Sequence, residues 1–411
     1  MSDETWWVRG TVVDARGGEP VVGQSVVVRD GQIVRLGGEP PADATVVDCS
    51  GLVITPGLID AHVHLGLSSD MNDNMRRVLS VAEIAADMFA NCAQTLEAGF
   101  TTVRDVGGAD GGLVGVVSSG KVPGPRILTS GPILCQTGGH GYLAPEWEPT
   151  EHWDHHAIPG LRTLSLMSDG PDEMRRNARE AFRRGASFLK LCVTGGVVSH
   201  HDELTDTQFT VEEIRAAVEE AAARGTYVTV HAHNNEGIRN AVEAGVRCVE
   251  HGSQIDEATA ALMAAHDVAH VPTLAVVEAL YADPVAAGLS AELVPRVAAV
   301  RQSMRDAIPI ARAAGVRVGS GSDLIGPHQR HRGAELVLRA ALESPMDALV
   351  AATRVNADIL GIADEVGTIE VGKRADLVAW SADPLADPAV FDDRERVVLV
   401  LQSGRIVKDS R

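Results

Sequence analysis

Three features are scarce in this sequence: basic clusters, long apolar runs and closely spaced cysteines. Lysine and arginine total 36 against 56 acidic residues, which gives a formal net charge of −20, and no dense basic block could follow a phosphate backbone. We therefore expect no nucleic-acid partner. No apolar run reaches the roughly 18 residues that a membrane span requires, so we expect no membrane partner either.

The cysteines are few and scattered. Five occur, and no two form a CxxC pair, which is typical of reduced thiols in a reducing compartment. The start of the chain, MSDETWWVRG, lacks a basic region followed by an apolar one. Both observations predict a cytoplasmic protein.

The remaining composition favours a folded α/β enzyme. The chain has 411 residues, of which 45% are hydrophobic, with 41 glycines and 19 prolines. Both ends contain short valine-rich segments separated by turn signals such as Asp30-Gly31. A sheet built from either end alone would be marginal, so we predict that residues 1–54 and 366–411 pair into one small antiparallel β-sandwich domain.

Residues 55–365 alternate between short apolar runs and alanine-rich helical stretches. The candidate strands are LIDAHVHL, TTVRDV, RILTSGPIL, FLKLCVTGG, YVTVHAH, RCVEHG, AHVPTL and VRVGSGSD. The helical stretches include VAEIAADMFANCAQTLEAG, PDEMRRNAREAFRRG, TVEEIRAAVEEAAARG and EGIRNAVEAG. This alternation predicts an α/β fold with a (β/α)8 TIM-like barrel. A doubly wound open sheet is the alternative, and it is disfavoured because most polar residues fall at the carboxyl ends of the runs.

Histidines and one aspartate mark the ends of several of these runs. His62 and His64 are two residues apart in a strand, so they project from the same face. His231, His251 and Asp323 end the fifth, sixth and eighth runs, and a barrel brings these ends to one rim. Imidazole and carboxylate groups suit Zn²⁺ or a neighbouring divalent metal.

Lys190 lies within FLKLCVTGG, a run that we expect to be buried. Burial lowers a lysine pKa, and a neutral amine can react with carbon dioxide to give a carbamate. Such an anionic group has two oxygens and can bridge two metal ions. The alternative is a lysine that pairs with an acidic residue.

The chain resembles the amidohydrolase superfamily of metal-dependent hydrolases over nearly its whole length. The resemblance is carried by PGLIDAHVHL (56–65), the lysine of the fourth run, the histidines of the fifth and sixth, the Ser-Asp of the eighth, and ATRVNADILGI with GTIEVGKRADLVAW. The motifs GGHGY (138–142), KLCVTGGV (190–197), HAHNNEGI (231–238) and EHGSQID (250–256) are similar to the branch that holds Xaa-Pro and Xaa-Arg/Lys dipeptidases, with ochratoxin- and phenylurea-cleaving relatives.

This resemblance implies a ligand set and a mechanism. His62, His64 and Asp323 would hold the more buried metal, His231 and His251 the second, and carbamylated Lys190 would bridge them. A hydroxide between the two ions would be the nucleophile. Asp323 would orient it and pass a proton to the leaving amine, and His140 would donate to the developing oxyanion.

Other polar residues are candidates for substrate contacts. His233 repeats the spacing of His231 and could replace it as a ligand, although a substrate-facing position is preferred. Arg330 and Arg332 follow Asp323 and could clasp a substrate carboxylate, and Tyr142 could contact a carboxylate or carbonyl. Either arginine could equally belong to a charged surface loop. The sequence leaves open the roles of His152, His155, His156, His200 and His201.

The leading hypothesis is a binuclear-metal hydrolase, most simply with zinc, that cleaves dipeptides or N-acyl amino acids. The alternative within hydrolases is an enzyme for neutral or cyclic amides, phenylureas or carbamates. A mononuclear imidazolone-type hydrolase or a deaminase would not need Lys190, and a catalytically silent barrel would be missing a ligand position. The ligand types also admit cobalt, manganese or iron. The resemblance further implies a homo-oligomer.

Overall fold

The computed structural model describes residues 4–69, 78–142, 144, 147–150, 157–199, 201–284 and 289–411. Four of the histidines whose roles the sequence leaves open lie outside these residues, namely His152, His155, His156 and His200. Among the described residues, no helix is both long enough and apolar enough to cross a membrane.

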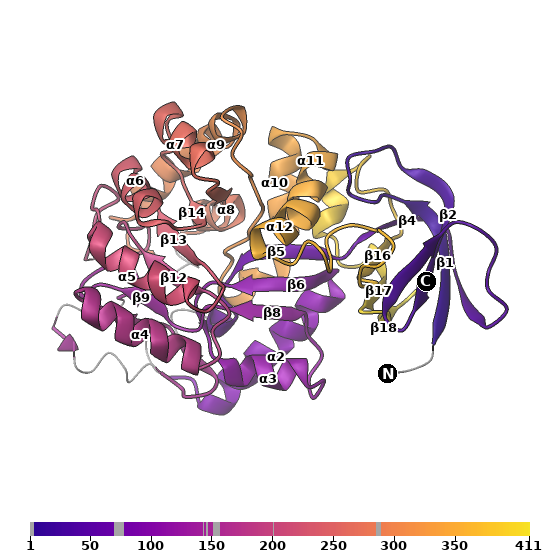
Figure 1. Ribbon diagram of the computed structural model, residues 1–411, viewed down its shortest axis with the longest axis horizontal. Coiled ribbons are helices and arrows are strands. Elements are labelled where there is room, and N and C mark those ends of the chain that lie inside the picture. Colours follow the sequence, from indigo (N-terminus) through magenta and orange to yellow (C-terminus); the bar gives the residue numbers. More distant parts are fainter. Residues whose placement is uncertain are drawn as a thin grey trace.

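Strands from both ends of the chain form one seven-stranded sheet, on the right of Figure 1. In spatial order its strands are β18 (Arg405–Asp409), β17 (Val397–Gln402), β16 (Leu377–Trp380), β4 (Ala44–Pro56), β1 (Thr5–Val12), β2 (Val21–Arg29) and β3 (Gln32–Leu36). The β2–β3 hairpin turns at Asp30 and Gly31, whose φ angles of 51° and 82° are both positive, as a type I′ turn requires. The turn expected from these two residues is therefore present.

Two details differ from the predicted antiparallel sandwich. β1 and β4 are parallel, with Thr5 opposite Ala44, because residues 37–43 carry the chain from β3 at the edge to the other side of β1. All seven strands are also hydrogen-bonded into one sheet rather than divided between two.

The strands of the central region are short and mostly buried, and all of them except the antiparallel pair β7 and β10 are parallel. One group of three is β5 (Leu58–Val63), β6 (Phe100–Asp105) and β8 (Arg126–Thr129). A group of six follows the order β11 (Ser165–Met167), β9 (Ile133–Cys135), β12 (Leu189–Cys192), β13 (Val228–Ala232), β14 (Cys248–His251) and β15 (Ala269–Val271). A two-stranded sheet pairs β7 (Gly108–Ala109) with β10 (Arg162–Thr163).

Backbone hydrogen bonds join these two groups at both edges. Ser187 N–H donates to the carbonyl of Thr129 at 2.7 Å, which links the segment just before β12 to β8. At the other edge, residues 317–323 lie between β15 and β5. The amide of Gly319 donates to the carbonyl of His270 at 2.8 Å, and the amide of Ala61 donates to the carbonyl of Ser320 at 3.1 Å.

The predicted eighth strand is thus an extended segment that makes isolated pairings and no regular strand. Its glycines allow a close approach to β5, because a Cβ on Gly321 would lie 2.4 Å from the Cβ of His62. The side-chain amide of Asn356 also connects β5 to this segment. It donates to the carbonyl oxygens of Ile59 at 2.7 Å and Ser320 at 2.8 Å. The side chain of Asn356 thereby pairs with backbone carbonyl groups that a regular β-ladder would use.

Helices follow most of the parallel strands. They are α2 (Val81–Glu97), α3 (Gly111–Ser118), α4 (Pro171–Arg183), α5 (Val211–Ala222), α6 (Asn235–Ala244), α7 (Glu257–Ala265), α8 (Leu274–Ala282), α9 (Val294–Ala313), α10 (Ala334–Leu342), α11 (Pro345–Val350) and α12 (Asn356–Leu360), with short turns η1 (Leu65–Leu67), η3 (Gly326–His331), η4 (Ala351–Val355) and η5 (Pro388–Asp392). The four helices predicted from sequence are present as α2, α4, α5 and α6. Capping explains two of their starts: Ser80 with Glu83 and Thr210 with Glu213 form capping boxes.

Candidate metal centre

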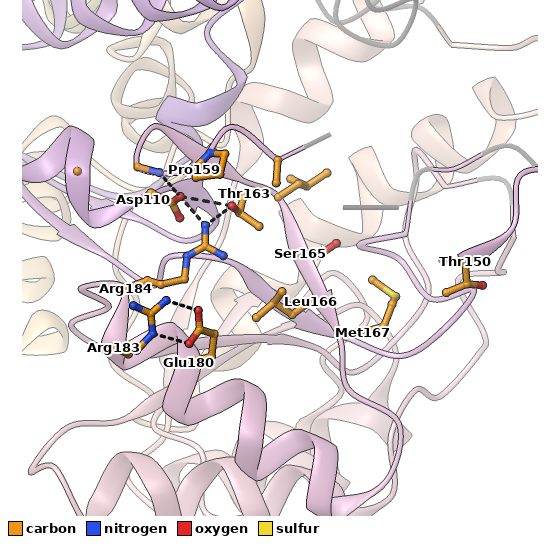
Figure 2. Close-up of a pocket in the computed structure, with 14 residues that line it drawn as sticks. Asp110, Thr150, Pro159, Thr163, Ser165, Leu166, Met167, Glu180, Arg183 and Arg184 are labelled. Atoms are coloured by element: carbon orange, nitrogen blue, oxygen red, sulfur yellow. Dashed lines mark hydrogen bonds and ion pairs between the residues drawn. The ribbon is translucent and has the colours of Figure 1, made fainter. Parts of the chain in front are cut away.

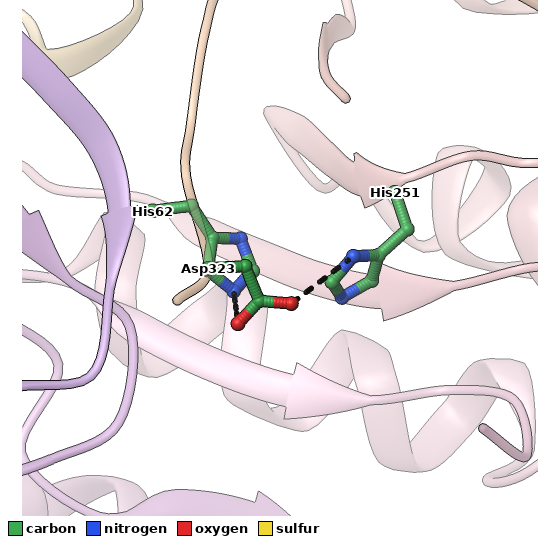
Figure 3. Close-up of side chains that lie close together, drawn as sticks. All are labelled: His62, His251 and Asp323. Carbon is green, nitrogen blue, oxygen red and sulfur yellow. Dashed lines mark ion pairs between the residues drawn. The ribbon is translucent and has the colours of Figure 1, made fainter. Parts of the chain in front are cut away.

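Three candidate ligands from distant parts of the chain meet at one point. His62 lies in β5, His251 ends β14, and Asp323 ends the extended segment (Figure 3). Asp323 Oδ1 lies 3.3 Å from Nε2 of His62, and Asp323 Oδ2 lies 3.8 Å from Nδ1 of His251. One potential ligand atom of each residue lies within 4.8 Å of the other two. His64 joins them, with its Nε2 3.1 Å from Asp323 Oδ1.

The first two histidines are oriented by partners on their other ring nitrogen. Nδ1 of His62 lies 2.8 Å from Glu250 Oε2, and Nδ1 of His64 lies 2.9 Å from the carbonyl oxygen of Gly107. A carbonyl or carboxylate oxygen only accepts, so each Nδ1 carries a proton and each Nε2 faces Asp323. Lone pairs that face one another at this distance require a proton or a cation between them. A divalent cation fits this donor set.

His64 and Asp323 strongly affect each other's pKa. Burial alone would lower the pKa of His64, but its hydrogen bond to Asp323 and the charges of Asp323 and Asp105 carry that pKa above its usual value. Burial would raise the pKa of Asp323, yet His62 and His64 hold it well below its usual range. Asp323 is therefore anionic at neutral pH.

Lys190, His231 and His251 lie on three neighbouring strands. In the parallel register, Lys190 of β12 is opposite Thr229 of β13, and Ala232 of β13 is opposite His251 of β14. Burial lowers the pKa of Lys190, although Glu250 and Asp323 oppose this effect, and burial carries the pKa values of His231 and His251 well below the usual range. Both rings are therefore neutral and keep a lone pair for a metal.

Two of these residues have a strained backbone. His251 and Asp323 have φ angles of 65° and 54°, in the left-handed region that residues other than glycine rarely adopt. The amide of Asp323 donates to the carbonyl of His62 at 2.8 Å. His270 Nε2 lies 2.8 Å from the carbonyl oxygen of His251, and burial lowers the pKa of His270 to about 4, so a neutral ring donates this bond. Such strain persists only where the surroundings hold it, and it is common at functional sites.

The six predicted metal ligands, together with His140 and His233, line a cavity of about 140 Å³. The ring of His140 stacks on His231 with 4.0 Å between centroids. Nδ1 of His140 lies 3.0 Å from Ser199 Oγ, and Nδ1 of His233 lies 2.9 Å from Ser253 Oγ. The structure thus brings eight of the predicted site residues to one cavity.

The hydrogen bonds of His140 differ from the role expected of it. The Ser199 hydroxyl donates to the carboxylate of Asp202, so it accepts from Nδ1 of His140. Nε2 of the neutral ring is then an acceptor, and burial lowers the pKa of His140. An oxyanion donor would need the protonated ring, which this environment disfavours.

The two predicted carboxylate-binding arginines lie elsewhere. Arg332 is buried between η3 and α2, where it donates to Gln329 Oε1 at 2.7 Å and Thr95 Oγ1 at 3.0 Å. Arg330 is exposed and lines a separate surface hollow with Arg394 and Lys408. Because η3 turns tightly, residues 329 and 332 face the interior and residue 330 faces solvent. Neither arginine is among the described residues that line the metal cavity.

Tyr142 is also outside that lining. It is buried near Thr150, 3.5 Å from hydroxyl to hydroxyl, and its ring lies 5.8 Å from that of His201. Nε2 of His201 lies 2.6 Å from the carbonyl oxygen of Ala144. His201 therefore secures the loop after β9 and does not line the metal cavity.

Most of the remaining described cavity wall is apolar, apart from Gly141, Cys192 and Thr273. The apolar residues come from η1, β9, the segments after β9 and β12, helices α8 and α9, and the loop after Asp323: Leu67, Ile133, Leu164, Val197, Val198, Val276, Val277, Leu280, Met304 and Ile325. Lys190 is the single lysine or arginine in the described lining.

A larger hollow of about 930 Å³ lies nearby and shares Leu164 with the metal cavity (Figure 2). Several of its polar groups pair with one another: Asp110 Oδ2 accepts from Arg184 at 2.5 Å and from Thr163 at 3.3 Å, and Arg183 pairs with Glu180. It contains none of the candidate ligands. Size alone therefore does not identify the site.

Sequence reasoning missed a buried layer beneath the ligands. Glu250 accepts from His62 and from Arg104, and Asp60 accepts from the amides of His62 at 3.1 Å and Ser322 at 2.9 Å. Their signal in the sequence is a charged residue inside an apolar strand, as in TTVRDV and RCVEHG. That signal indicates a buried charged residue, but it does not identify the residue that pairs with it.

Comparison with known proteins identifies the family of this chain. Residues 53–407 match the Amidohydrolase family. This chain belongs to the amidohydrolase family. The family resemblance inferred from the motifs is thereby confirmed, and the protein is a hydrolase of amide-type C–N bonds.

Individual relatives are similar over almost the whole chain. Ochratoxinase from Aspergillus niger is 31% identical over 412 residues, which span 95% of this chain and 84% of the relative. A prolidase solved in complex with N-methylphosphonate-L-proline has a TM-score of 0.92 at 37% identity, covering 98% of this chain and 100% of that one. A Xaa-Pro dipeptidase with methionine bound in its active site has a TM-score of 0.87 at 30% identity, covering 98% and 99%.

Proposed function

We propose that this amidohydrolase is a binuclear metal-dependent enzyme that cleaves small carboxylate-bearing amides, and that its parallel strands close into a (β/α)8 barrel. The observation that carries the proposal is the convergence of His62, His64, His251 and Asp323, with the Nδ1 of each of the first two histidines already engaged. This arrangement points the two Nε2 atoms and an anionic carboxylate at one position.

The ligands divide between two ions. His62, His64 and Asp323 would hold the more buried ion, and His231 and His251 the other, with carbamylated Lys190 shared between them. Zinc fits these ligands best, and cobalt, manganese or iron fit them as well. When bound, the two ions would lower the pKa of a water molecule between them and polarise the amide carbonyl.

Asp323 would act as the general base. Its carboxylate is anionic at neutral pH and is held in place by His62 and His64. It would accept a proton from the attacking water and deliver that proton to the leaving nitrogen. The strained backbone of Asp323 fixes the direction of this carboxylate.

His140 and His233 would contact the substrate. Both line the cavity and both have Nδ1 next to a serine hydroxyl. The Nε2 of neutral His140 would accept a hydrogen bond from a substrate N–H. His233 would take over part of the carboxylate recognition expected of Arg330 and Arg332, because it lines the cavity and they do not.

The apolar wall favours a substrate with an uncharged, apolar group beside the scissile amide. An unpaired charge buried against Val276, Val277 and Met304 would cost several kcal/mol. A dipeptide or N-acyl amino acid with an aliphatic or aromatic side chain satisfies this requirement. The names of the similar proteins, prolidase, Xaa-Pro dipeptidase and ochratoxinase, agree with this class.

A second candidate function follows from the same wall. Because Lys190 is the single lysine or arginine in the described lining, neutral amides, phenylureas or carbamates would also fit. In that case no group of the substrate would need a cationic partner.

A mass-spectrometric hydrolysis screen of the metal-loaded protein tests these alternatives. Apolar dipeptides and N-acyl amino acids form one set, and their C-terminal amides, phenylureas, carbamates and lactams form the other. We expect cleavage of the carboxylates and at least tenfold slower turnover of the matched C-terminal amides. Equal turnover of acids and amides would favour the second function, and no cleavage in either set would contradict both.

A further inference from the structure

Glu250 accepts hydrogen bonds from four side chains beneath the metal cavity. It is fully buried near the end of β14. Its Oε2 lies 2.8 Å from Nδ1 of His62, and its Oε1 accepts from Arg104 Nη2 at 2.6 Å. The hydroxyl of Thr229 and the thiol of Cys248 also donate to Oε1. Donors on β5, β6, β13 and β14 therefore meet on one carboxylate.

This arrangement excludes Glu250 itself as a metal ligand. Both of its oxygens accept from donors in this layer, and Glu250 is not among the described residues that line the metal cavity. Arg104 compensates the buried negative charge, and its Nε also donates to the carbonyl of Ala61 at 2.6 Å, next to His62 in β5. Arg104 thus fixes both the carboxylate and the adjacent backbone.

We propose that the Arg104–Glu250 pair is a positioning device that fixes the tautomer and ring orientation of His62 for metal binding. An anionic acceptor on Nδ1 keeps the proton there and leaves Nε2 bare. The same contact increases the basicity of Nε2, which strengthens a bond to a cation. Burying an ion pair contributes little to stability by itself, so its place beneath His62 indicates a role at the site. The inference rests on the proposed metal centre.

The test is Glu250→Gln, which preserves size and removes the charge. An amide presents one oxygen and one NH2 group, so it cannot accept from both Arg104 and His62. If the NH2 group faces His62, it donates to Nδ1 and moves the ring proton to Nε2, where the metal would bind. We expect 10- to 100-fold weaker metal affinity, measured by competition with a chromophoric chelator. The visible absorption of the cobalt-loaded protein should change as well.

Two further variants separate positioning from folding. Asp376→Asn removes a less buried ion pair away from the cavity, Arg126 to Asp376 at 2.9 Å, and should lower the melting temperature while metal affinity stays within twofold of wild type. The double variant Arg104→Met with Glu250→Gln leaves no unpaired buried charge, and it should fold and still bind metal 10- to 100-fold more weakly.

The outcomes are distinguishable. Wild-type affinity and an unchanged cobalt spectrum in folded Glu250→Gln and in the folded double variant would overturn the positioning role while leaving the metal centre intact. If the wild-type protein itself retains no metal after loading and dialysis, the proposed function fails first. If Asp376→Asn weakened metal affinity as much as Glu250→Gln does, loss of any ion pair would be acting through stability. That result would overturn the inference.

Discussion

Lys190 is the side chain whose chemistry the proposed metal centre would depend on most. It is buried, its pKa is lowered by that burial, and it lies on the strand between β9 and β13. We predict that Lys190→Ala reduces the bound metal from about two ions to about one per chain and lowers kcat by at least 100-fold, since one bridging ligand is lost. Metal analysis by inductively coupled plasma mass spectrometry, together with kinetics, measures both effects.

The matched control is Lys121→Ala, because Lys121 is exposed and distant in sequence from every candidate ligand. It should leave metal content and kcat unchanged. Two bound ions and wild-type kcat in Lys190→Ala would remove the bridging role and favour a lysine that pairs with Glu250 or Asp323.

The sequence was most informative where a ligand type falls at a strand end. His62, His64, His231, His251 and Asp323 are brought to one cavity because the ends of parallel strands share an edge. The roles of Glu250, Arg104 and Arg332 depend on partners that are far away in the sequence, such as Arg332 with Asp60. No local pattern gives that information. The two arginines after Asp323 were misplaced because the direction of each depends on the tight turn of η3.

Among the helices, α8 contributes most to the cavity wall, through Val276, Val277 and Leu280. We predict that Val277→Asp lowers kcat/KM for an apolar dipeptide by 10- to 100-fold, because an unpaired polar group in this wall costs about 1–3 kcal/mol. Metal content should not change.

Tyr281→Ser on the same helix is the control, since Tyr281 is half exposed and contacts Arg301 on the outside. It should retain wild-type kcat/KM. An unaltered kcat/KM in Val277→Asp would show that the substrate does not contact this wall.

The start of α8 depends on a buried carboxyl group in α10. Glu335 Oε2 accepts from the amide of Ala275 at 2.8 Å, and burial raises the pKa of Glu335 to about 8 from a usual value of 4.5. The folded state therefore holds this proton more tightly than the unfolded chain does. The stabilisation is complete below about pH 4.5 and is lost as the pH rises through about 8.

Glu335→Gln removes this titration. We predict that the melting temperature of the variant, relative to wild type, rises between about pH 5 and pH 8 and is constant above that range. Calorimetry across this range measures the difference. Glu212→Gln, at an exposed position of α5, should follow the wild-type profile. Parallel profiles for Glu335→Gln and wild type would show that Glu335 is ionised in the folded protein.

The sequence predicted helices and turns correctly, because they depend on residues close together in the chain. It did not predict strand pairings that depend on residues far apart. α2 and α5 follow from their capping boxes, and the β2–β3 hairpin follows from Asp30-Gly31. The parallel pairing of β1 with β4 depends on how residues 37–43 cross the sheet, which no strand pattern encodes. The loss of regular strand at 317–323 depends on Asn356, a residue more than thirty positions later.

Across the chain as a whole, the candidate metal centre joins segments that are separated by up to 261 positions, from His62 to Asp323. The unfolded chain does not hold these ligands together, so bound metal stabilises only the folded state. At a free metal concentration of about 1,000 times Kd, one site contributes about 4 kcal/mol. We predict that removing the metal with a chelator lowers the melting temperature by several degrees, and that adding zinc back restores it.

Asp323→Asn is the decisive comparison for this prediction, because it keeps the size of the side chain and removes the charge that faces His62 and His64. The variant should melt at nearly the same temperature with and without zinc. Lys190→Ala, with one ion retained, should show a shift between that of the variant and that of wild type. If chelation empties the wild-type protein and its melting temperature does not move, the metal binds the folded and the unfolded chain equally well, which contradicts the prediction. Metal binding would then be uncoupled from folding.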